Sequence, residues 1–224
     1  MERRRRTPSL EGKEVYMHAH LDWKYVDDAA GENEHIAAAR VTSREHGLTP
    51  IAPSMGAQYA VATASAAATN IIEIGTGYGV SGLWLLEGAP EATLTSIDDD
   101  YDHHEQSKTI FAQAGYAANK VRLITGNAID VLPRMNDNDY DVALVDGDPT
   151  QLQTNVQHAL RLVRSGGIVL IPHALWNGEV AEPAKRGAVP SALRSIMRNA
   201  NDDDSQVWSL SPVGDGLITI VKRA

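Results

Sequence analysis

Cysteine is absent from the 224 residues of this chain. Disulfide bridges, thiol nucleophiles and zinc–cysteine sites are therefore excluded, and the composition is compatible with a reducing cytoplasm. No apolar run approaches the roughly 20 residues that span a bilayer. The N-terminal stretch MERRRRTPSL has basic residues but lacks the apolar segment of a secretory signal. We therefore expect a cytoplasmic protein with no membrane partner.

Positive charge is also scarce. The chain has 20 lysines and arginines against 29 aspartates and glutamates, which leaves a formal net charge of −9. Residues 3–6 are all arginine, so the rest of the chain is more acidic still. Proteins that bind nucleic acid present a basic face. We therefore expect no nucleic-acid partner, and we interpret the arginine run as a solvated terminal segment.

Short apolar runs alternate with helical patterns beyond about residue 70. Most runs end in glycine or aspartate, which is typical of repeated strand–helix units and a mostly parallel sheet. Apolar residues at helical spacing between 152 and 163 predict a crossover helix, with Gly166 as its left-handed stop. The predicted strands are 71–74, 93–97, 121–125, 140–145 and 167–171.

The end of the chain departs from this alternation. After a helix that begins in VPSALRSIM, the strand-like runs SQVWSLS and GLITIVKR are joined by the turn-rich PVGDG. Because so short a link cannot hold a crossover helix, we expect an antiparallel hairpin at one edge of the sheet. Before residue 70, GENEHIAAARVTSREHG and SMGAQYAVATASAAAT predict two helices. We expect residues 1–30 to be an irregular N-terminal segment and residues 31–224 to be a single domain.

The stretch IIEIGTGYGVSG, residues 71–82, joins the first predicted strand to a helix. A dinucleotide fingerprint has glycine at the first, third and sixth positions, where backbone amides meet a pyrophosphate. Counted from Gly75, the third position is Gly77 but the sixth is Val80, and no phosphate-loop lysine follows. The loop therefore favours a bulky adenosyl ligand without phosphates, because glycine has no Cβ atom to block a close approach. Glu73 is placed to attract an ammonium group of such a ligand.

Asp98 follows the second predicted strand, in TLTSIDDD. A carboxylate at the tip of this strand can accept hydrogen bonds from both ribose hydroxyls of an adenosyl ligand. A helix cap or a solvated turn is the alternative role for such an acid, and it suits Asp99 and Asp100 better. We therefore predict that Asp98 binds the ribose.

Several segments of the chain occur in the order, and at nearly the spacing, seen in one enzyme family. They are IIEIGTGYGVSGLWLL, LTSID, LITGNAIDVLP, YDVALVDGDP, VRSGGIVLI, HALWNG and LSPVGDGLITIVKR. Over roughly residues 32–222 the chain resembles the small O-methyltransferases related to catechol and caffeoyl-CoA O-methyltransferases. The resemblance implies an α/β fold of the class I methyltransferase (Rossmann-like) type, with a seven-stranded sheet of order 3-2-1-4-5-7-6, strand 7 antiparallel and helices on both faces.

The same resemblance implies a function. The chain would be an enzyme that transfers the methyl group of S-adenosylmethionine to a hydroxyl of a small, aromatic acceptor and releases S-adenosylhomocysteine. Relatives of this kind are homodimers, so a homodimer is expected here.

The resemblance also implies roles for particular residues. The methionine part of the cofactor would be surrounded by Glu73, Gly75, Thr76, Gly77 and Ser81, with the Ser81 hydroxyl at its carboxylate. Asp98 would hold the ribose and Ala128 would meet the adenine edge. Further cofactor contacts would come from Ile51, Gly56, Asp146 and Asp148. The acceptor site would be walled by Trp176 and Asn177.

The sequence departs from the family at the expected metal site. Relatives hold a divalent cation with an aspartate after the fourth strand and an Asp–Asn pair after the fifth. Asp146 matches the first ligand, but Pro172 and His173 replace the pair, and Pro149 stands where relatives have a lysine. Magnesium prefers oxygen ligands over imidazole nitrogen. We therefore expect no metal, and a cation of another kind would have only Asp146 and His173 as ligands.

We predict instead that His173 is the general base for the acceptor hydroxyl and that Asp146 orients it, because a free imidazole titrates near pH 6.5. A structural histidine in an altered pocket is the alternative. The other histidines join no such group, and we expect them at surface or helix positions.

Three alternative functions have less support in the sequence. The replacements at Pro149 and Pro172 favour a protein that binds S-adenosylmethionine but has a degenerate catalytic site. An NAD-dependent oxidoreductase is disfavoured by Val80, and a nucleic-acid methyltransferase is disfavoured by the acidic composition.

Overall fold

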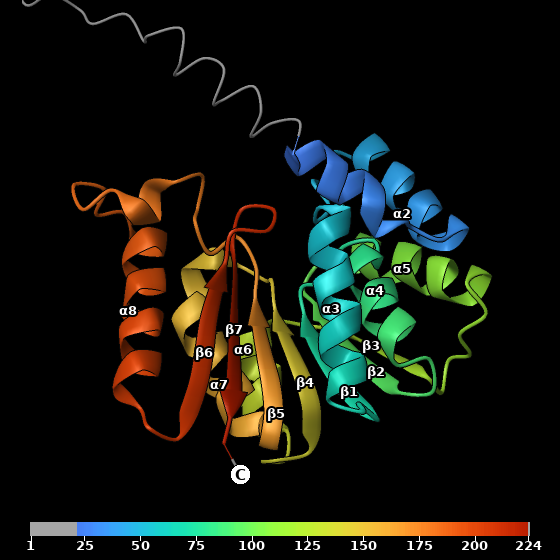
Figure 1. Ribbon diagram of the computed structural model, residues 1–224. Helices are drawn as coiled ribbons and strands as arrows, with labels where there is room; N and C mark the ends of the chain where they lie inside the picture. The colour runs from blue at the N-terminus through green and yellow to red at the C-terminus, as the bar shows by residue number, and fades with distance from the viewer. Residues whose placement is uncertain (1–21, 224) are drawn as a thin grey trace, which may run out of the picture.

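The computed structural model of the protein describes residues 22–223 (Figure 1). Its seven strands form one sheet in the order β3-β2-β1-β4-β5-β7-β6, which confirms the predicted order. The strands are β1 (Asn70–Ile74), β2 (Thr93–Asp98), β3 (Val121–Thr125), β4 (Tyr140–Val145), β5 (Val163–Ile171), β6 (Gln206–Ser211) and β7 (Leu217–Lys222). The longer helices are α2 (Glu34–Glu45), α3 (Pro53–Ser65), α4 (Val80–Gly88), α5 (Tyr101–Gln113), α7 (Leu152–Leu162) and α8 (Ala188–Asp202). The short ones are α6 (Ala128–Val131), η1 (Leu132–Arg134), η2 (Pro149–Gln151) and η3 (Glu179–Ala181).

Strand β7 runs antiparallel to both of its neighbours, β5 and β6, whereas β1 to β5 pair in parallel. The predicted C-terminal hairpin is therefore confirmed. The predicted strand bounds agree with the structure to within one residue except in β5, which begins at Val163 directly after α7. Gly166 has φ 78° but lies inside β5, so the prediction that it ends the helix was wrong.

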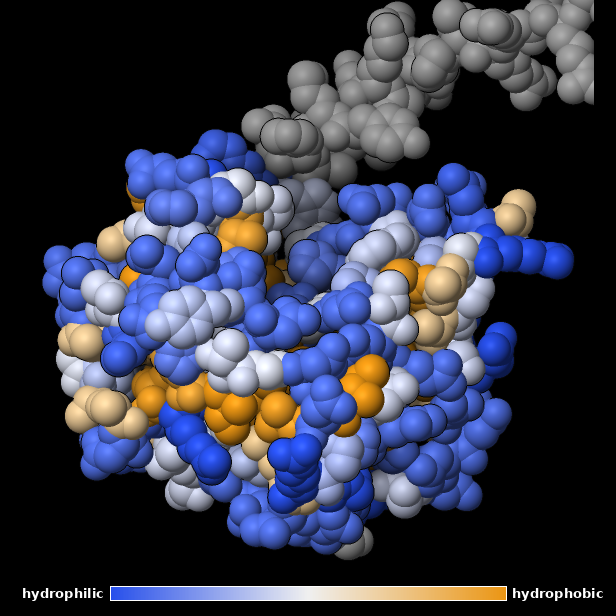
Figure 2. Space-filling model, turned by 180° about the vertical axis from the view of Figure 1, so that it is seen from behind, coloured by the Kyte–Doolittle hydropathy of each residue, from blue (hydrophilic) through white to orange (hydrophobic). Residues whose placement is uncertain are grey.

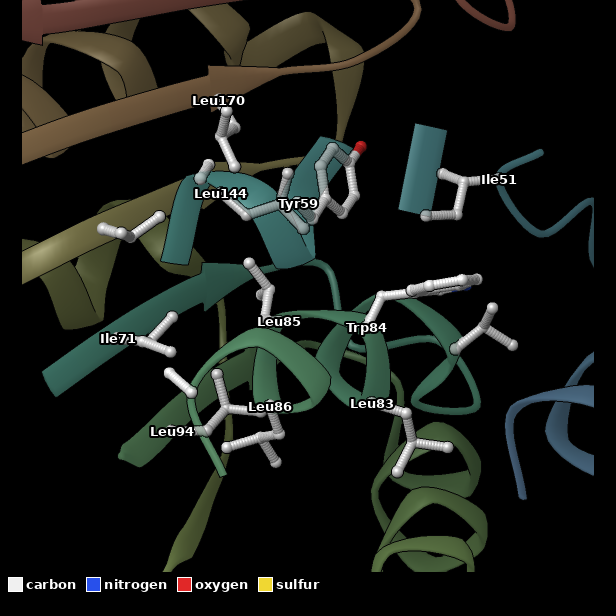
Figure 3. Close-up of a cluster of buried hydrophobic side chains, with 14 of the residues drawn as sticks. Ile51, Tyr59, Ile71, Leu83, Trp84, Leu85, Leu86, Leu94, Leu144 and Leu170 are labelled. Atoms are coloured by element: carbon white, nitrogen blue, oxygen red, sulfur yellow. The ribbon is translucent and has the colours of Figure 1, made fainter. Parts of the chain in front are cut away.

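Helices cover both faces of the sheet, as predicted. Successive residues of a strand point to opposite faces. In β1, Ile71 belongs to the core formed with α2, α3, α4 and α5 (Figure 3), while Ile72 belongs to the core formed with α7 and α8. Glu73 follows Ile71 by two positions, so its side chain shares the α4 face of the sheet, where it is fully buried.

Residues 22–30 form a helix, whereas the sequence predicted an irregular segment there; residues 1–21 lie outside the described residues. The helix escaped prediction because its apolar side chains do not form a buried stripe. Trp23, Tyr25 and Val26 are 44%, 74% and 43% exposed. Periodicity predicts a helix only where one face is buried.

Asp27 fastens this first helix to α3. Its Oδ1 atom accepts hydrogen bonds from the backbone nitrogen of Ser54 (3.2 Å) and from the Ser54 hydroxyl (2.5 Å). Ser54 lies in the first turn of α3, where free backbone amides favour a negative charge. The carboxylate of Asp27 therefore stabilises the start of α3.

The surface is mostly hydrophilic on the face shown in Figure 2, with a band of hydrophobic side chains across it. None of the helices in residues 22–223 combines the length and the apolar character needed to cross a membrane. The buried apolar residues form two cores, one on each side of the sheet.

Candidate active site

A cavity of about 350 Å³ opens at the C-terminal ends of the parallel strands. Strands β1 and β4 are neighbours there. The strand order continues from β1 through β2 and β3 to one edge of the sheet, and from β4 through β5, β7 and β6 to the other. In open α/β sheets, ligands bind at such a switch in strand order. The cavity is lined by Ser43, Leu48, Thr49, Pro50, Ile51, Ile74, Gly75, Thr76, Gly77, Tyr78, Val80, Ser81, Ile97, Asp98, Asp99, His103, Gly126, Asn127, Ala128, Asp146, Gly147, Asp148, Gln151 and His173.

The glycine loop after β1 forms one wall of the cavity. Gly75 has φ 96°, and a Cβ atom added to it would lie 2.2 Å from the carbonyl oxygen of Asp146. Only glycine accommodates both this left-handed backbone and the close approach to the tip of β4. Gly79, with φ 81°, is the N-cap residue immediately before α4. The loop therefore turns tightly against β4 and leaves the cavity open above it.

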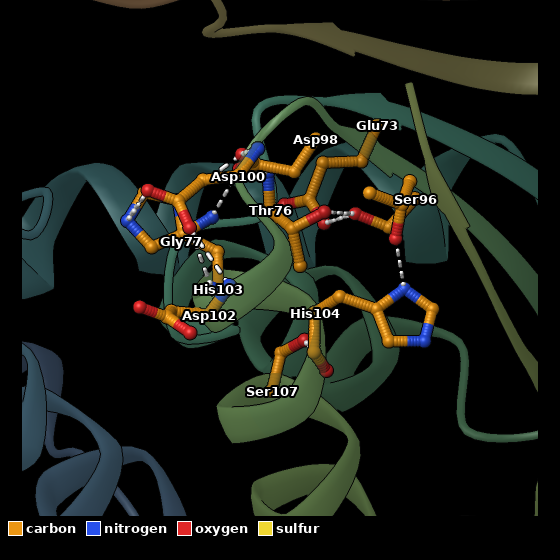
Figure 4. Close-up of polar contacts among 11 residues, drawn as sticks. Glu73, Thr76, Gly77, Ser96, Asp98, Asp100, Asp102, His103, His104 and Ser107 are labelled. Atoms are coloured by element: carbon orange, nitrogen blue, oxygen red, sulfur yellow. Dashed lines mark hydrogen bonds and ion pairs between the residues drawn. The ribbon is translucent and has the colours of Figure 1, made fainter.

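Glu73 lies beneath the loop. Its side chain is fully buried, and in the described part of the chain it does not line the cavity. Its Oε1 atom accepts a hydrogen bond from the Ser81 hydroxyl (2.5 Å), and its Oε2 atom accepts one from the Ser96 hydroxyl (2.6 Å). Ser96 is also 2.6 Å from the Thr76 hydroxyl (Figure 4). Burial raises the pKa of Glu73 to about 8, although the two serine hydrogen bonds favour the charged form. The carboxyl group is thus held in a dry polar network.

Asp98 is bonded on both oxygens (Figure 4). Its Oδ2 atom accepts from the backbone amides of Thr76 and Gly77, each at 2.9 Å. Its Oδ1 atom accepts from the backbone amide of Asp100 at 3.0 Å and lies 3.1 Å from Nδ1 of His103. Asp98 therefore links the glycine loop to the start of α5.

Asp100 caps the N-terminus of α5, which is the alternative role predicted for the acids after Asp98. Its side chain accepts hydrogen bonds from the backbone nitrogens of Asp102 (2.8 Å) and His103 (3.4 Å). Asp99 lines the cavity beside Asp98.

Buried polar contacts hold the segment before α3 over the cavity. The Nη1 atom of Arg40 donates a 2.5 Å hydrogen bond to the carbonyl oxygen of Ile51, and Glu32 accepts from the Nε and Nη2 atoms of the same guanidinium. Ile51 is 5% exposed and lines the cavity. On the opposite side, Ala128 begins α6 and Asp148 accepts two hydrogen bonds from Thr150 at the start of η2.

Asp146 and His173 meet at the tips of β4 and β5. The Nε2 atom of His173 is 3.7 Å from Oδ1 of Asp146, which is too long for a hydrogen bond but close enough for an ion pair. The side chain of His173 is 38% exposed and that of Asp146 is 26% exposed. Burial raises the pKa of Asp146, and the charge of His173 opposes that rise. Among residues 22–223, no three or more His, Asp and Glu side chains are grouped as metal ligands.

The segment from His173 to Asn177 has an unusual backbone. His173, Trp176 and Asn177 have φ values of 55°, 49° and 52°, in the left-handed region that non-glycine residues rarely occupy. Hydrogen bonds donated to Asp215 in the β6–β7 turn hold this shape. The backbone amide of Leu175 donates to the carbonyl of Asp215 (2.8 Å), and the amide of Asn177 donates to the Asp215 carboxylate (2.9 Å). Strained backbone that is held this firmly is common at functional sites.

The structure brings most of the predicted site residues together. The cavity lining includes Ile51, Gly75, Thr76, Gly77, Ser81, Asp98, Ala128, Asp146, Asp148 and His173. Within the described part of the chain it does not include Gly56, Glu73, Trp176 or Asn177.

Two of these four residues have evident packing roles. A Cβ atom on Gly56 would lie 2.3 Å from the indole of Trp84, so this glycine allows α3 to pack closely on α4. Trp176 packs against the core that includes α7 and α8.

Sequence reasoning missed several residues of the cavity, notably Tyr78, Asn127, Gln151 and His103. His103 was expected at a surface or helix position, outside any group of site residues. It does lie on helix α5, but its side chain contacts Asp98 and lines the cavity, so the expectation that it joins no site was wrong. His18 and His20 lie outside the described residues.

Comparisons with known proteins agree with this geometry. A model of the O-methyltransferase family matches residues 40–224. A protein of Mycobacterium leprae that carries the provisional name O-methyltransferase is 35% identical over 200 residues, which is 89% of each chain. A crystal structure of a Corynebacterium glutamicum protein has 27% identity and a TM-score of 0.84, covering 93% of this chain and 98% of that one.

The O-methyltransferase TomG from Streptomyces achromogenes, crystallised with S-adenosylmethionine, has 24% identity and a TM-score of 0.74 over 87% of this chain and 92% of its own. This likeness shows the shared fold. With a family model that spans most of the sequence and a curated relative above 30% identity, the chain belongs to the O-methyltransferase family.

Proposed function

We propose that the protein transfers the methyl group of S-adenosylmethionine to a hydroxyl of a small aromatic molecule. The observation that carries the proposal is the cavity at the β1–β4 switch, whose lining includes the glycine loop and, bonded to it, Asp98. Family membership supports the reaction class. S-adenosylmethionine is a substrate here, because it leaves as S-adenosylhomocysteine.

The residues of the cavity suit such a molecule. Gly75 lets the loop lie tightly against the backbone of Asp146, where a Cβ atom would clash, and both Gly75 and Gly77 line the cavity. Asp98 stands where the ribose of an adenosyl group would lie, and Ala128 presents a small apolar side chain for adenine. Ser81 and Thr76 are placed for the methionine end. Glu73 would act through Ser81 and the loop, because it lies beneath them.

Binding provides the first test. Calorimetry should detect S-adenosylmethionine and S-adenosylhomocysteine, with no comparable heat for NAD. Binding of NAD alone would overturn the proposal.

The proposal gives His173 the role of general base. Its Nε2 atom would take the proton of the acceptor hydroxyl while the oxygen attacks the methyl carbon. The carbon–sulfur bond then breaks, and its electron pair stays on sulfur as the neutral thioether. Asp146, 3.7 Å away, would stabilise the imidazolium that forms. No divalent cation is needed for these steps.

Chelation separates this mechanism from a metal-dependent one. Methyl transfer should survive EDTA, and His173→Ala should lower the rate about 100-fold or more. The rate should also fall on acidification, because a protonated imidazole cannot accept a proton. Loss of activity with EDTA and recovery with manganese or zinc would mean that Asp146 and His173 hold a metal.

A second candidate function is binding of S-adenosylmethionine without catalysis. It is favoured by Pro149 and Pro172, which stand where relatives have a lysine and a metal ligand, and by the absence of a hydrogen bond between His173 and Asp146 in the described structure. A broad screen of hydroxylated aromatic acceptors with methyl-labelled cofactor decides between the two. Tight binding with no transfer to any acceptor would support the second candidate.

The proposal includes a cytoplasmic homodimer. Among residues 22–223, five of the nine exposed large hydrophobic side chains come from the helices before β1: Trp23, Tyr25, Val26, Val41 and Val61. Such residues suit a partner surface, and a stable interface buries more than about 1,000 Å². Light scattering at micromolar concentration should give the mass of a dimer, and a monomeric mass would contradict this part. Cell fractionation tests the compartment.

A further inference from the structure

The carboxylate of Asp98 has no unused acceptor position. A carboxylate offers about four lone-pair sites on its two oxygens. In this structure Thr76, Gly77 and Asp100 each direct a backbone amide at it, and Nδ1 of His103 is the fourth partner at 3.1 Å. Because an ionised carboxylate can only accept, Nδ1 must be the donor in this contact. A ribose hydroxyl can donate to Asp98 only if one of these four donors gives way.

Three of the four donors are fixed by the backbone. The amides of Thr76 and Gly77 belong to the loop that Gly75 anchors through a 2.8 Å hydrogen bond to the carbonyl of Ile97. The amide of Asp100 belongs to the residue that caps α5. Moving any of these amides would distort the loop or the helix. His103 is the one side-chain donor to Asp98 in residues 22–223, and it can leave by a rotation of its side chain.

His103 is also in the right place to move. Its ring lines the cavity and lies edge-on to Tyr78 with 5.5 Å between ring centroids. Its Nε2 atom is 3.9 Å from Oδ2 of Asp100, a partly exposed carboxylate that offers an alternative partner. The side chain is 22% exposed, so rotation does not require the core to open.

We propose that His103 occupies the ribose position on Asp98 in the unliganded protein, and that the ribose of the cofactor displaces it. This inference rests on the proposed function, because it takes S-adenosylmethionine as the ligand of the cavity. His103 is then a competitor of the ribose for the carboxylate of Asp98. Its departure costs binding energy, so affinity for the cofactor is lower than the cavity alone would allow.

Two variants test the proposal. His103→Ala removes the ring, and His103→Phe keeps a ring beside Tyr78 but removes the donor. By calorimetry, both should bind S-adenosylhomocysteine about 3- to 10-fold more tightly than the wild type, the usual scale of one net hydrogen bond. His104→Ala is the matched control, because His104 is the next residue of α5 and pairs with Thr125 at 2.9 Å. It should leave the affinity unchanged.

Unchanged or weaker binding in both His103 variants would overturn the proposal, since the histidine would then be indifferent to the ribose or would bind it directly. Nitrogen NMR of the wild-type protein gives an independent readout that does not depend on whether a variant folds. The Nδ1 signal of His103 should shift when S-adenosylhomocysteine is added, and a signal that stays constant at saturation also overturns the idea. Failure of the wild type to bind S-adenosylhomocysteine at all would instead count against the proposed function.

Discussion

The Ser81 hydroxyl lies 2.5 Å from Oε1 of Glu73 and donates its hydrogen bond inward, beneath the glycine loop. The resemblance to relatives placed this hydroxyl at the carboxylate of the methionine group. Ser81 does line the cavity, but its proton is already committed to Glu73. A cofactor carboxylate would therefore compete with Glu73 for the Ser81 hydroxyl. The protonation state of Glu73 would then affect cofactor affinity.

The first prediction concerns the pH dependence of folding. Burial raises the pKa of Glu73 to about 8 in the folded protein, whereas an unfolded glutamate titrates near about 4.3. Between these values the folded state holds a proton that the unfolded state has lost, so stability falls as pH rises. The contribution of Glu73 is therefore most favourable below about pH 4 and is lost as pH rises through about 8.

Glu73→Gln removes this titration. The melting temperature of the variant should rise relative to that of the wild type as pH increases from 5 to about 8. Glu91→Gln is a suitable control, because the Glu91 side chain is 95% exposed. Parallel pH profiles for the wild type and Glu73→Gln would show that Glu73 is already ionised in the folded protein.

The second prediction separates backbone strain from steric conflict. Gly75 and Gly115 have φ values of 96° and 88°, but a Cβ on Gly75 would lie 2.2 Å from the Asp146 carbonyl oxygen. At Gly115, residues 22–223 place nothing within 4 Å of the added atom. Gly115→Ala should cost about 1 kcal/mol of unfolding free energy from strain alone. Gly75→Ala should cost about 1–3 kcal/mol more and abolish cofactor binding. Equal losses in denaturant titration would contradict the contact with β4.

The third prediction concerns the proposed ribose site. Asp98→Ala removes the proposed acceptor for the ribose hydroxyls and leaves the amides of Thr76 and Gly77 without their partner. Affinity for S-adenosylhomocysteine should fall roughly 30- to 1000-fold, equivalent to about 2–4 kcal/mol. Asp102→Ala, at an exposed position in the first turn of α5, is the control. Calorimetry that finds the Asp98→Ala affinity unchanged would remove Asp98 from the cofactor site.

The fourth prediction compares two buried hydroxyl groups near α4. The Tyr59 hydroxyl is fully buried without a hydrogen-bond partner in residues 22–223, whereas the Thr63 hydroxyl is 2.9 Å from the carbonyl of Leu85. Burial raises the pKa of Tyr59 well above its usual value, so the phenol stays neutral. Tyr59→Phe should keep or increase the unfolding free energy, while Thr63→Val should lower it by about 1 kcal/mol. A clear loss of stability in Tyr59→Phe would reveal a partner for its hydroxyl.

The sequence by itself determined the features that depend on residues close together along the chain. The strands at 121–125 and 140–145 were predicted with the bounds that the structure shows, because each is a short run rich in β-branched and apolar residues between polar or turn-forming residues. The C-terminal hairpin followed from a link too short for a crossover. The position of Val80 in the glycine loop by itself argues against a dinucleotide ligand.

Only the tertiary structure decided which side chains meet across the sheet and between helices. Ser96 reaches Glu73 because β2 pairs with β1 in a register that places these two residues side by side. His103 faces Asp98 because Asp100 fixes where α5 begins, and Gly56 meets Trp84 because α3 packs on α4. Each of these contacts depends on strand register, helix rotation or interhelical distance. Local sequence patterns carry none of that information, since it arises only when distant segments pack together.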